Sequence, residues 1–261
     1  MVFSSSIFLF IFLPVVLISY YNPFFKSRSF KNSILLLSSL FFYAWGEPAF
    51  VFLMIFSIFV NFELGKKVFS YGTTEKNNLH LQKIYLVVSV IWNVGLLFVF
   101  KYLSFLSNVF SDLFFTMNFP VIEIQLPIGI SFFTFQALSY VIDVYRDRHE
   151  AQKNFFKYAL FVSFFPQLVQ GPISRYGDLS RELYTPHDFS GRVVARGLER
   201  VIWGFFKKLV IADRILPAVK VMIETPENYK GMFVFMVMMF YALELYADFT
   251  GGIDITIGIA E

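Results

Sequence analysis

Three carboxylates near the end of the chain are the first candidates for chemistry. Glu244 and Asp248 are four residues apart, which places them on one face of a helix, and Asp254 follows within a few turns. Such a group could bind a cation, hold basic groups of other helices, or face water. We favour the supporting role, because buried acids are normally paired. Two carboxylates could also act as acid and base, but the spacing does not show that these face each other.

Other side chains that perform catalysis are scarce. The sequence has no cysteine and three histidines, His80, His149 and His187, so it excludes disulfides and cysteine ligands and leaves little for a metal site. His80 and His149 lie in basic, loop-like stretches, where we expect solvated surface residues. The sequence lacks the phosphate-binding loop, the nucleophile elbow and the paired histidines of soluble enzymes. We expect no bound cofactor, no metal and no nucleic acid partner.

The composition indicates an all-α, polytopic membrane protein. Of the 261 residues, 57% are apolar and 16% are charged, whereas soluble domains are nearer 45–50% and 25%. One helical crossing takes about 20 residues, so the length permits about six or seven crossings. The first run, residues 2–21, has no basic segment before it and no small-residue cleavage site after it, so we interpret it as a retained span.

Six further apolar runs follow the first. Two short ones meet at Gly46-Glu47-Pro48, which predicts a tight helical hairpin because proline cannot continue the preceding helix. The six runs are residues 33–45, 49–62, 84–100, 126–145, 155–173 and 232–246, the last with a weaker continuation to 259.

The charges between the runs predict their orientation. Residues 22–32 carry three basic residues and no acid, residues 107–125 carry two acids and no basic residue, and basic residues follow Tyr145 again. Basic loops favour the cytoplasmic side, so the N-terminus is expected outside and the stretch after Tyr145 inside the cell. Asp143, at the end of its run, is expected to pair with Arg146 or Arg148.

The run 155–173 breaks this alternation, because basic residues both precede and follow it. Its centre contains Pro166, Gly171 and Pro172, and broken backbone at membrane depth is tolerated only where protein or a water-filled cavity covers it. We predict a re-entrant hairpin that enters and leaves on the cytoplasmic side, which lowers the count to about six transmembrane helices. The alternative is that residues 155–173 form an ordinary transmembrane span and the basic residues that follow lie outside the cell.

Residues 192–216 have the periodicity of an amphipathic helix. Apolar residues recur on one stripe, and basic residues lie elsewhere around the helix. Such a helix could lie in the membrane interface against anionic lipid. It could equally pack on the rest of the protein with a solvated basic face. The stripe consists of Val194, Leu198, Ile202, Phe205 and Leu209.

Several motifs in order along the chain resemble the membrane-bound O-acyltransferase (MBOAT) family. The similarity is greatest to the branch of bacterial alginate O-acetyltransferase and the protein that D-alanylates teichoic acids. The motifs are Phe42-Tyr43-Ala44-Trp45, Leu126-Pro127-Ile128-Gly129-Ile130-Ser131-Phe132-Phe133-Thr134-Phe135-Gln136, Asp143-Val144-Tyr145-Arg146, Phe164-Phe165-Pro166-Gln167 with Gly171-Pro172-Ile173, Trp203-Gly204-Phe205-Phe206-Lys207-Lys208 and Tyr246-Ala247-Asp248-Phe249-Thr250-Gly251.

The resemblance implies a multi-pass acyltransferase of the bacterial inner membrane, with helices around a channel. An acyl donor such as acetyl-CoA or a carrier-protein thioester would arrive on the cytoplasmic side. The acyl group would reach a hydroxyl of a cell-envelope or exported polysaccharide, or a second acyltransferase, on the outer side. A histidine in the channel would assist, because a sugar hydroxyl needs a base and histidine titrates near working pH.

The resemblance also implies that this chain carries no catalytic histidine. In the family, further spans with the catalytic histidine follow the segment that matches 246–251, and neither His80, His149 nor His187 stands in those motifs. The expected histidine lies beyond Glu261. Residues 1–261 are then a single integral membrane domain, the N-terminal half of an MBOAT fold, and inactive alone.

Six polar residues are candidates for lining the channel or supporting its framework, and a folding role is favoured for each. A transporter or channel-like protein is the alternative function, motivated by the intramembrane carboxylates and the broken backbone. The six candidates are Gln136, Gln167, Gln170, Arg175, Asp248 and Asp254.

Overall fold

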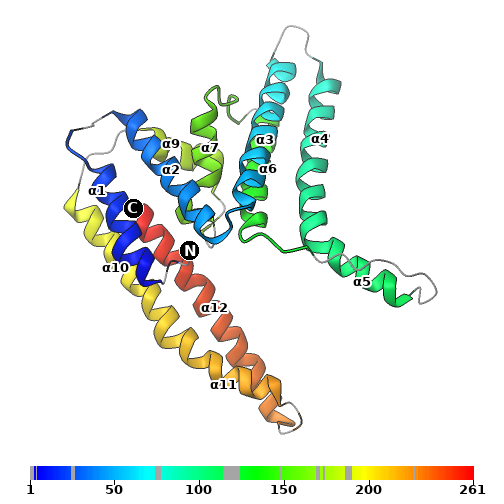
Figure 1. The fold of residues 1–261 in the computed structure, drawn as a ribbon, viewed down its shortest axis with the longest axis vertical. Helices are drawn as coiled ribbons and strands as arrows, with labels where there is room; N and C mark the ends of the chain where they lie inside the picture. The colour runs from blue at the N-terminus through cyan, green and yellow to red at the C-terminus, as the bar shows by residue number, and fades with distance from the viewer. Residues whose placement is uncertain are drawn as a thin grey trace. The chain divides into compact units, whose positions relative to one another are not determined.

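Every regular element that the structure describes is a helix, which confirms the all-α class (Figure 1). The structure is a computed structural model. It describes residues 3, 5–24, 27–73, 78–113, 124–146, 148–168, 171–172, 174–185, 190–225, 227 and 229–261. The chain forms two compact units, a larger one of residues 15–169 and 173–186 and a smaller one of residues 2–14, 170–172 and 187–261. A π-helical turn, Phe8–Phe12, opens the chain, and helix α1, Leu13–Tyr20, follows it.

The larger unit contains helices α2 to α9. Helices α3, α4 and α6 pack on one another, and α2 packs against α7. The helices are α2 (Arg28–Gly46), α3 (Phe50–Thr73), α4 (Leu79–Leu97), α5 (Leu103–Leu113), α6 (Ile130–Tyr145), α7 (Phe155–Ser163), α8 (Phe165–Leu168) and α9 (Tyr176–Tyr184), with a π-helical turn, Phe98–Tyr102, between α4 and α5.

Proline and glycine end several helices where the sequence predicts it. Helix α2 ends at Gly46 and α3 begins at Phe50, so the hinge at Gly46-Glu47-Pro48 is confirmed. Both helices extend beyond the apolar runs, however, because polar residues continue each helix at its outer end. The apolar run 84–100 also belongs to a longer helical stretch, from Leu79 to Val109.

Helix α6 begins at Ile130, four residues later than the apolar run predicts. Gly129 has φ 76°, a left-handed conformation that only glycine adopts without strain, and it precedes the first helical turn. A Cβ at Gly129 would also lie 2.6 Å from the carbonyl oxygen of Leu168. The start of α6 is therefore fixed by a close backbone approach from a distant part of the chain.

The apolar run 155–173 is not one helix. Helix α7 ends at Ser163, Phe164 is extended with ψ 112°, and the short α8 follows. The break removes the intrahelical partner of the Phe165 N–H, which donates instead to Ser39 Oγ of α2 at 3.1 Å. Pro166 has no N–H to satisfy, so the broken backbone is stabilised from within the protein.

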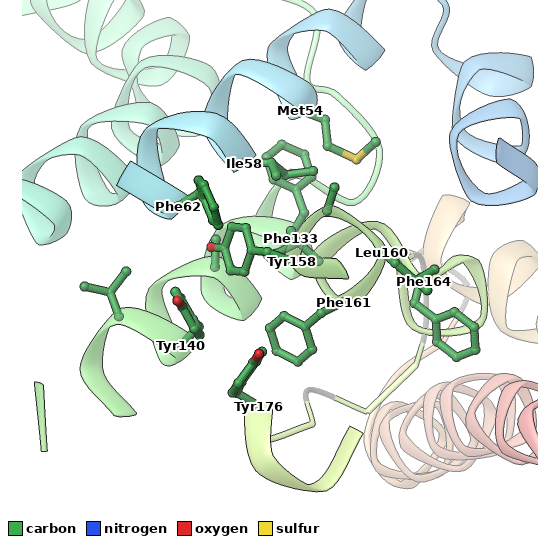
Figure 2. Close-up of a cluster of buried hydrophobic side chains, with 14 of the residues drawn as sticks. Met54, Ile58, Phe62, Phe133, Tyr140, Tyr158, Leu160, Phe161, Phe164 and Tyr176 are labelled. Atoms are coloured by element: carbon green, nitrogen blue, oxygen red, sulfur yellow. The ribbon is translucent and has the colours of Figure 1, made fainter. Parts of the chain in front are cut away.

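The core of the larger unit surrounds α7, as Figure 2 shows. All six residues 158–163 are buried, so the helix is covered on every side beyond its exposed first turn. Aromatic rings from three helices meet there, with ring centroids 4.6 Å apart for Tyr140 and Tyr158 and 4.9 Å apart for Phe161 and Tyr176.

A polar contact in this unit links α3 to α4. Asn61 and Asn93 exchange amide hydrogen bonds of 3.2 and 2.7 Å, and Ser89 Oγ donates to Asn61 Oδ1 at 3.1 Å. All three side chains are buried. Hydrogen bonds of this kind join helices where no water competes for them.

The smaller unit is built on a long helical hairpin. Its first arm comprises α10 (Gly191–Phe205), a π-helical turn (Phe206–Ala212) and α11 (Asp213–Glu224). Its second arm is α12 (Met232–Ala260), which lies alongside the first (Figure 1). A Cβ on Gly197 would lie 2.6 Å from Gly258 O, and one on Gly204 2.6 Å from Gly251 O. The arms are therefore antiparallel and in backbone contact.

Among the residues that the structure describes, two helical stretches are long and apolar enough to cross a membrane, Leu79–Val109 and Met232–Ala260. Shorter apolar helices are Phe8–Tyr20 and Ile130–Tyr145. Few residues of the two long stretches are buried inside the structure, 17% and 11% of the most apolar windows. Large apolar side chains therefore face outward, as lipid contact would require. These features are those of a helical membrane protein.

Candidate functional site

The break between α7 and α8 brings together two of the six candidate residues. Gln136 of α6 is buried, and its Nε2 donates to Gln167 Oε1 of α8 at 3.5 Å. Gln167 Nε2 donates in turn to Ser174 Oγ at 2.8 Å. The result is a chain of polar groups at the broken helix, which begins at the buried Gln136 and continues through the half-buried Gln167 and Ser174. Amide and hydroxyl groups of this kind can hydrogen-bond a carbonyl or hydroxyl of a substrate.

The other two candidates of this region, Arg175 and Gln170, are not part of this chain of hydrogen bonds among the described residues. Arg175 is exposed and stands at the start of α9, where its carbonyl accepts the Leu179 N–H at 3.2 Å. Its position follows Ser174 directly, so it lies beside the polar chain along the sequence. Gln170 lies outside the described residues.

The remaining two candidates are ion-paired across the helical hairpin. Asp248 pairs with Lys208, and Asp254 pairs with Lys207 and with Arg200, whose Nε lies 3.2 Å from Asp254 Oδ1. Of the roles that the sequence allows for these carboxylates, the structure therefore shows the pairing with basic groups. Lys207 also donates to the carbonyl oxygen of Thr250 at 3.4 Å.

The π-helical turn explains how two adjacent lysines can reach the same helix. Successive residues of an α-helix point about 100° apart, whereas a π-helical turn is wider and brings neighbours closer in direction. Gly251 lies between the two aspartates, and a Cβ there would lie 3.4 Å from Lys207 Cβ. The two lysine side chains extend in opposite directions along α12, Lys207 to Asp254 and Lys208 to Asp248.

Glu244, the third acid of the group, differs from the other two. Its residue is 7% exposed, and it forms no ion pair with any residue that the structure describes. It lies seven residues before Gly251, and so on the side of α12 that faces the first arm. The three acids therefore do not form one site.

Of the histidines, one agrees with the expectation and one does not. His80 is exposed in the first turn of α4, as predicted. His149 is half-buried, with its ring edge-on to Tyr176 at a centroid distance of 5.8 Å. The surface prediction for His149 is therefore wrong, because α9 places an aromatic ring and the backbone of Gly177 beside it. His187 lies outside the described residues. Asp143 pairs with Arg148 at 3.4 Å, one of the two partners expected.

Sequence reasoning missed a cluster of tyrosines. Tyr140 OH accepts the Gln152 N–H at 2.9 Å, and Gln152 Nε2 donates to Tyr176 OH at 2.9 Å. Tyr184 OH donates to the carbonyl oxygen of Lys157 at 2.7 Å. Burial raises the pKa of Tyr176 and of Tyr184 above the usual phenol value, so both stay protonated. These tyrosines come from two helices, α6 and α9, and no local pattern marks them.

No group of three or more metal-ligating side chains occurs among the residues that the structure describes. The amide and hydroxyl groups at the α7–α8 break are uncharged, and Asp248 and Asp254 of the hairpin are paired with basic residues. In the described part of the chain, the site can bind and orient polar groups but offers no evident base.

Comparison with known proteins confirms the resemblance to bacterial O-acyltransferases. The chain is 34% identical over 266 residues to "Probable alginate O-acetylase AlgI" of Pseudomonas aeruginosa, and 35% identical to the protein of that name in Pseudomonas syringae pv. tomato. It is 31% identical over 287 residues to "Peptidoglycan O-acetyltransferase" of Helicobacter pylori. Each match covers 99% of this chain. No family model matches the chain.

The matches cover only part of each relative, 49%, 49% and 53% respectively. The chain therefore spans about half the length of the curated relatives it matches. None of these relatives is named as a transporter, and the aspartates that motivated that alternative are ion-paired. Nothing favours the transporter alternative.

Proposed function

We propose that the chain is part of a membrane-bound O-acetyltransferase that acts on hydroxyl groups of a cell-envelope or exported polysaccharide. The observation that carries the proposal is the match of about 34% identity along 99% of the chain to proteins named alginate O-acetylase. The peptidoglycan O-acetyltransferase match supports acetyl transfer to a polysaccharide without selecting between the two acceptors.

The proposed reaction moves an acetyl group from a thioester to a sugar. The sugar oxygen forms a bond to the acetyl carbon, the carbon–sulfur bond breaks, and the hydroxyl proton passes through a base to the leaving thiol. The donor would be acetyl-CoA or a carrier-protein thioester on the cytoplasmic side. We assign no catalytic residue to this chain. The base would be a histidine in the part of the O-acetylase relatives that lies outside the matched half.

Within this proposal, Gln136, Gln167 and Arg175 line the path of the acyl group. The support is the polar chain that runs from the buried Gln136 through Gln167 to Ser174 at a broken helix. An amide N–H held there could orient the acetyl carbonyl. Asp248 and Asp254 belong to the framework, because each is held by a basic residue of the opposite arm.

We further propose that residues 1–261 form one multi-pass domain of the bacterial inner membrane, with about six spans and the N-terminus outside. Helix α7 has 9 residues and is about 14 Å long, too short for a hydrocarbon core of about 30 Å. Its length, its break and its buried surface support a re-entrant hairpin. Helix α10 packs along α12, yet its apolar stripe stays exposed, which supports contact with lipid.

A chimera tests the proposed function. The matched segment of an alginate O-acetylase would be replaced by this chain and expressed in an alginate-producing bacterium that lacks its own O-acetylase. We expect acetyl esters on the secreted alginate, detected by proton NMR. If the chimera is folded and inserted and the intact relative restores acetylation, alginate without acetyl esters would count against the proposal. Acetylated peptidoglycan in a parallel experiment would select the other acceptor.

A further inference from the structure

Helix α10 and the first residue of the π-helical turn after it carry an exposed stripe that the hairpin contacts do not use. Arg192, Arg196, Glu199, Trp203 and Phe206 follow one another at spacings of four, three, four and three residues, so they lie on one side of the helix. Gly197 and Gly204, which face α12, lie on another side. All five side chains of the stripe are exposed, including Trp203 at 55% and Phe206 at 43%.

The charges of this stripe differ from those farther along the arm. Arg200, Lys207 and Lys208 are paired with acids of the second arm or its end. Arg192 and Arg196 form no ion pair with any residue of the described ranges, and Glu199 forms none either. The two arginines leave a net positive charge at the exposed end of α10.

The order of residues along the stripe matches the layers of a bilayer. The arginines lie at the end of the hairpin opposite the connection 225–231. Trp203 and Phe206 come about 10 and 15 Å beyond Arg196 along the axis, and their rings stack with centroids 5.3 Å apart and an interplanar angle of 12°. Charged groups at headgroup level followed by a tryptophan are typical of a membrane interface. Helix α12, with 29 residues, is about 43 Å long and so exceeds the hydrocarbon core.

We propose that this stripe binds an anionic phospholipid, with the headgroup phosphate at Arg192 and Arg196 and an acyl chain along Trp203 and Phe206. Guanidinium groups bind phosphate in a fixed, bidentate geometry. The stacked rings present a flat apolar surface to the chain. The inference rests on the membrane placement proposed above but requires no acyl transfer, so its test is independent of enzymatic activity.

Quenching of Trp203 fluorescence by brominated lipids tests the site. The full chain with Trp45→Phe and Trp92→Phe, which leave Trp203 as the single tryptophan, would be reconstituted into phosphatidylcholine vesicles with brominated phosphatidylglycerol or brominated phosphatidylcholine. We expect stronger quenching by phosphatidylglycerol. Replacing both arginines, Arg192→Gln with Arg196→Gln, should lower its relative binding constant by about 30-fold, corresponding to about 1 kcal/mol per arginine.

Matched variants separate this site from general charge effects. Lys83→Gln with Lys153→Gln removes two exposed cations elsewhere and should leave the preference unchanged. Arg192→Lys with Arg196→Lys should keep most of the preference for phosphatidylglycerol. Glu199→Gln should increase this preference, because it removes a negative charge that repels the headgroup. Equal quenching by the two lipids, or an equal loss in the Lys83 and Lys153 variant, would overturn the proposal.

Two further arms separate the lipid site from a site for free phosphate and from a failure to fold. Inorganic phosphate, compared with chloride at equal ionic strength, should not abolish the preference, and its abolition would show a site for free phosphate instead. If the tryptophan replacements prevent folding, native mass spectrometry of the chain with its own tryptophans replaces the fluorescence. In that experiment, the protein should retain more phosphatidylglycerol than phosphatidylcholine, and the variant that lacks both arginines should lose this preference. A preference that is unchanged in the arginine variant would overturn the proposal.

Discussion

Gly204 and Gly251 are in backbone contact across the hairpin of α10 and α12. A Cβ on Gly204 would lie 2.6 Å from the carbonyl oxygen of Gly251, and a Cβ on Gly251 would lie 2.8 Å from that of Gly204. The same relationship recurs two helical turns away, between Gly197 and Gly258. Small residues at such spacing allow helices to pack closely within a membrane. The hairpin therefore depends on the absence of side chains at these four positions.

Gly204→Ala is accordingly expected to destabilise the chain. The added methyl group has to push the two backbones apart, at a cost on the order of 1–3 kcal/mol. Gly95→Ala is the matched control, because a Cβ at Gly95 meets no atom within 4 Å and should be neutral or slightly stabilising. Thermal unfolding followed by size-exclusion fluorescence measures both. Equal melting temperatures for the two variants would contradict the backbone contact.

The ion pair of Lys208 and Asp248 is expected to stabilise the hairpin through its charges. Asp248→Lys should cost about 2 kcal/mol, between the values for exposed and buried pairs, because the side chains are 21% and 34% exposed. Combining it with Lys208→Asp should restore much of the loss. The exposed pair of Lys66 and Glu63, 45% and 41% exposed, is the control and should contribute less than about 0.5 kcal/mol. Failure of the double variant to recover stability would contradict the pairing.

The amide pair of Asn61 and Asn93 yields an asymmetric prediction. Asn61→Leu alone leaves the buried amide of Asn93 without its partner, so we expect a loss of about 1–3 kcal/mol. Asn61→Leu with Asn93→Leu removes both polar groups and should be less damaging than the sum of the single changes. A thermal-unfolding cycle of the four proteins measures the coupling. Strictly additive losses would show that the pair is not coupled.

Cysteine labelling tests the proposed topology, since the natural sequence has no cysteine. Ser180→Cys and Ser190→Cys, within the basic segment that follows residues 155–173, should react with an impermeant reagent only from the cytoplasmic side. Ser27→Cys is the cytoplasmic reference and Gln125→Cys the outer reference, and both positions are exposed. Labelling of positions 180 and 190 only from outside would make residues 155–173 an ordinary span.

Prolines and composition made part of this fold predictable. The hinge at Gly46-Glu47-Pro48 and the break before Pro166 follow from local backbone chemistry, and helical class and membrane character follow from the apolar excess. The start of α6 was not predictable, because the left-handed Gly129 lies against a carbonyl from Leu168, 39 positions away in sequence. Nothing local marks such a contact.

The candidate site shows the same division. The acids of α12 predicted basic partners, because they lie in an apolar helix. That these partners are Lys207 and Lys208 depends on a π-helical turn, which no sequence pattern indicated. The contact of Gln136 with Gln167 depends on where the broken helix folds back. The tyrosines around Gln152 and the amides of Asn61 and Asn93 were missed, because Tyr140 and Tyr176, like the two asparagines, lie on different helices.

Acetyl transfer by purified protein tests the central claim most directly. The chimera of this chain with the remaining half of an alginate O-acetylase would be reconstituted in vesicles and given a radiolabelled acetyl donor and alginate. We expect labelled alginate, and a rate reduced about tenfold or more by Gln136→Ala with Gln167→Ala, while Ser139→Ala, on the same helix, stays near the parent rate. No label on alginate from a folded chimera, under conditions in which the intact relative is active, would contradict the account.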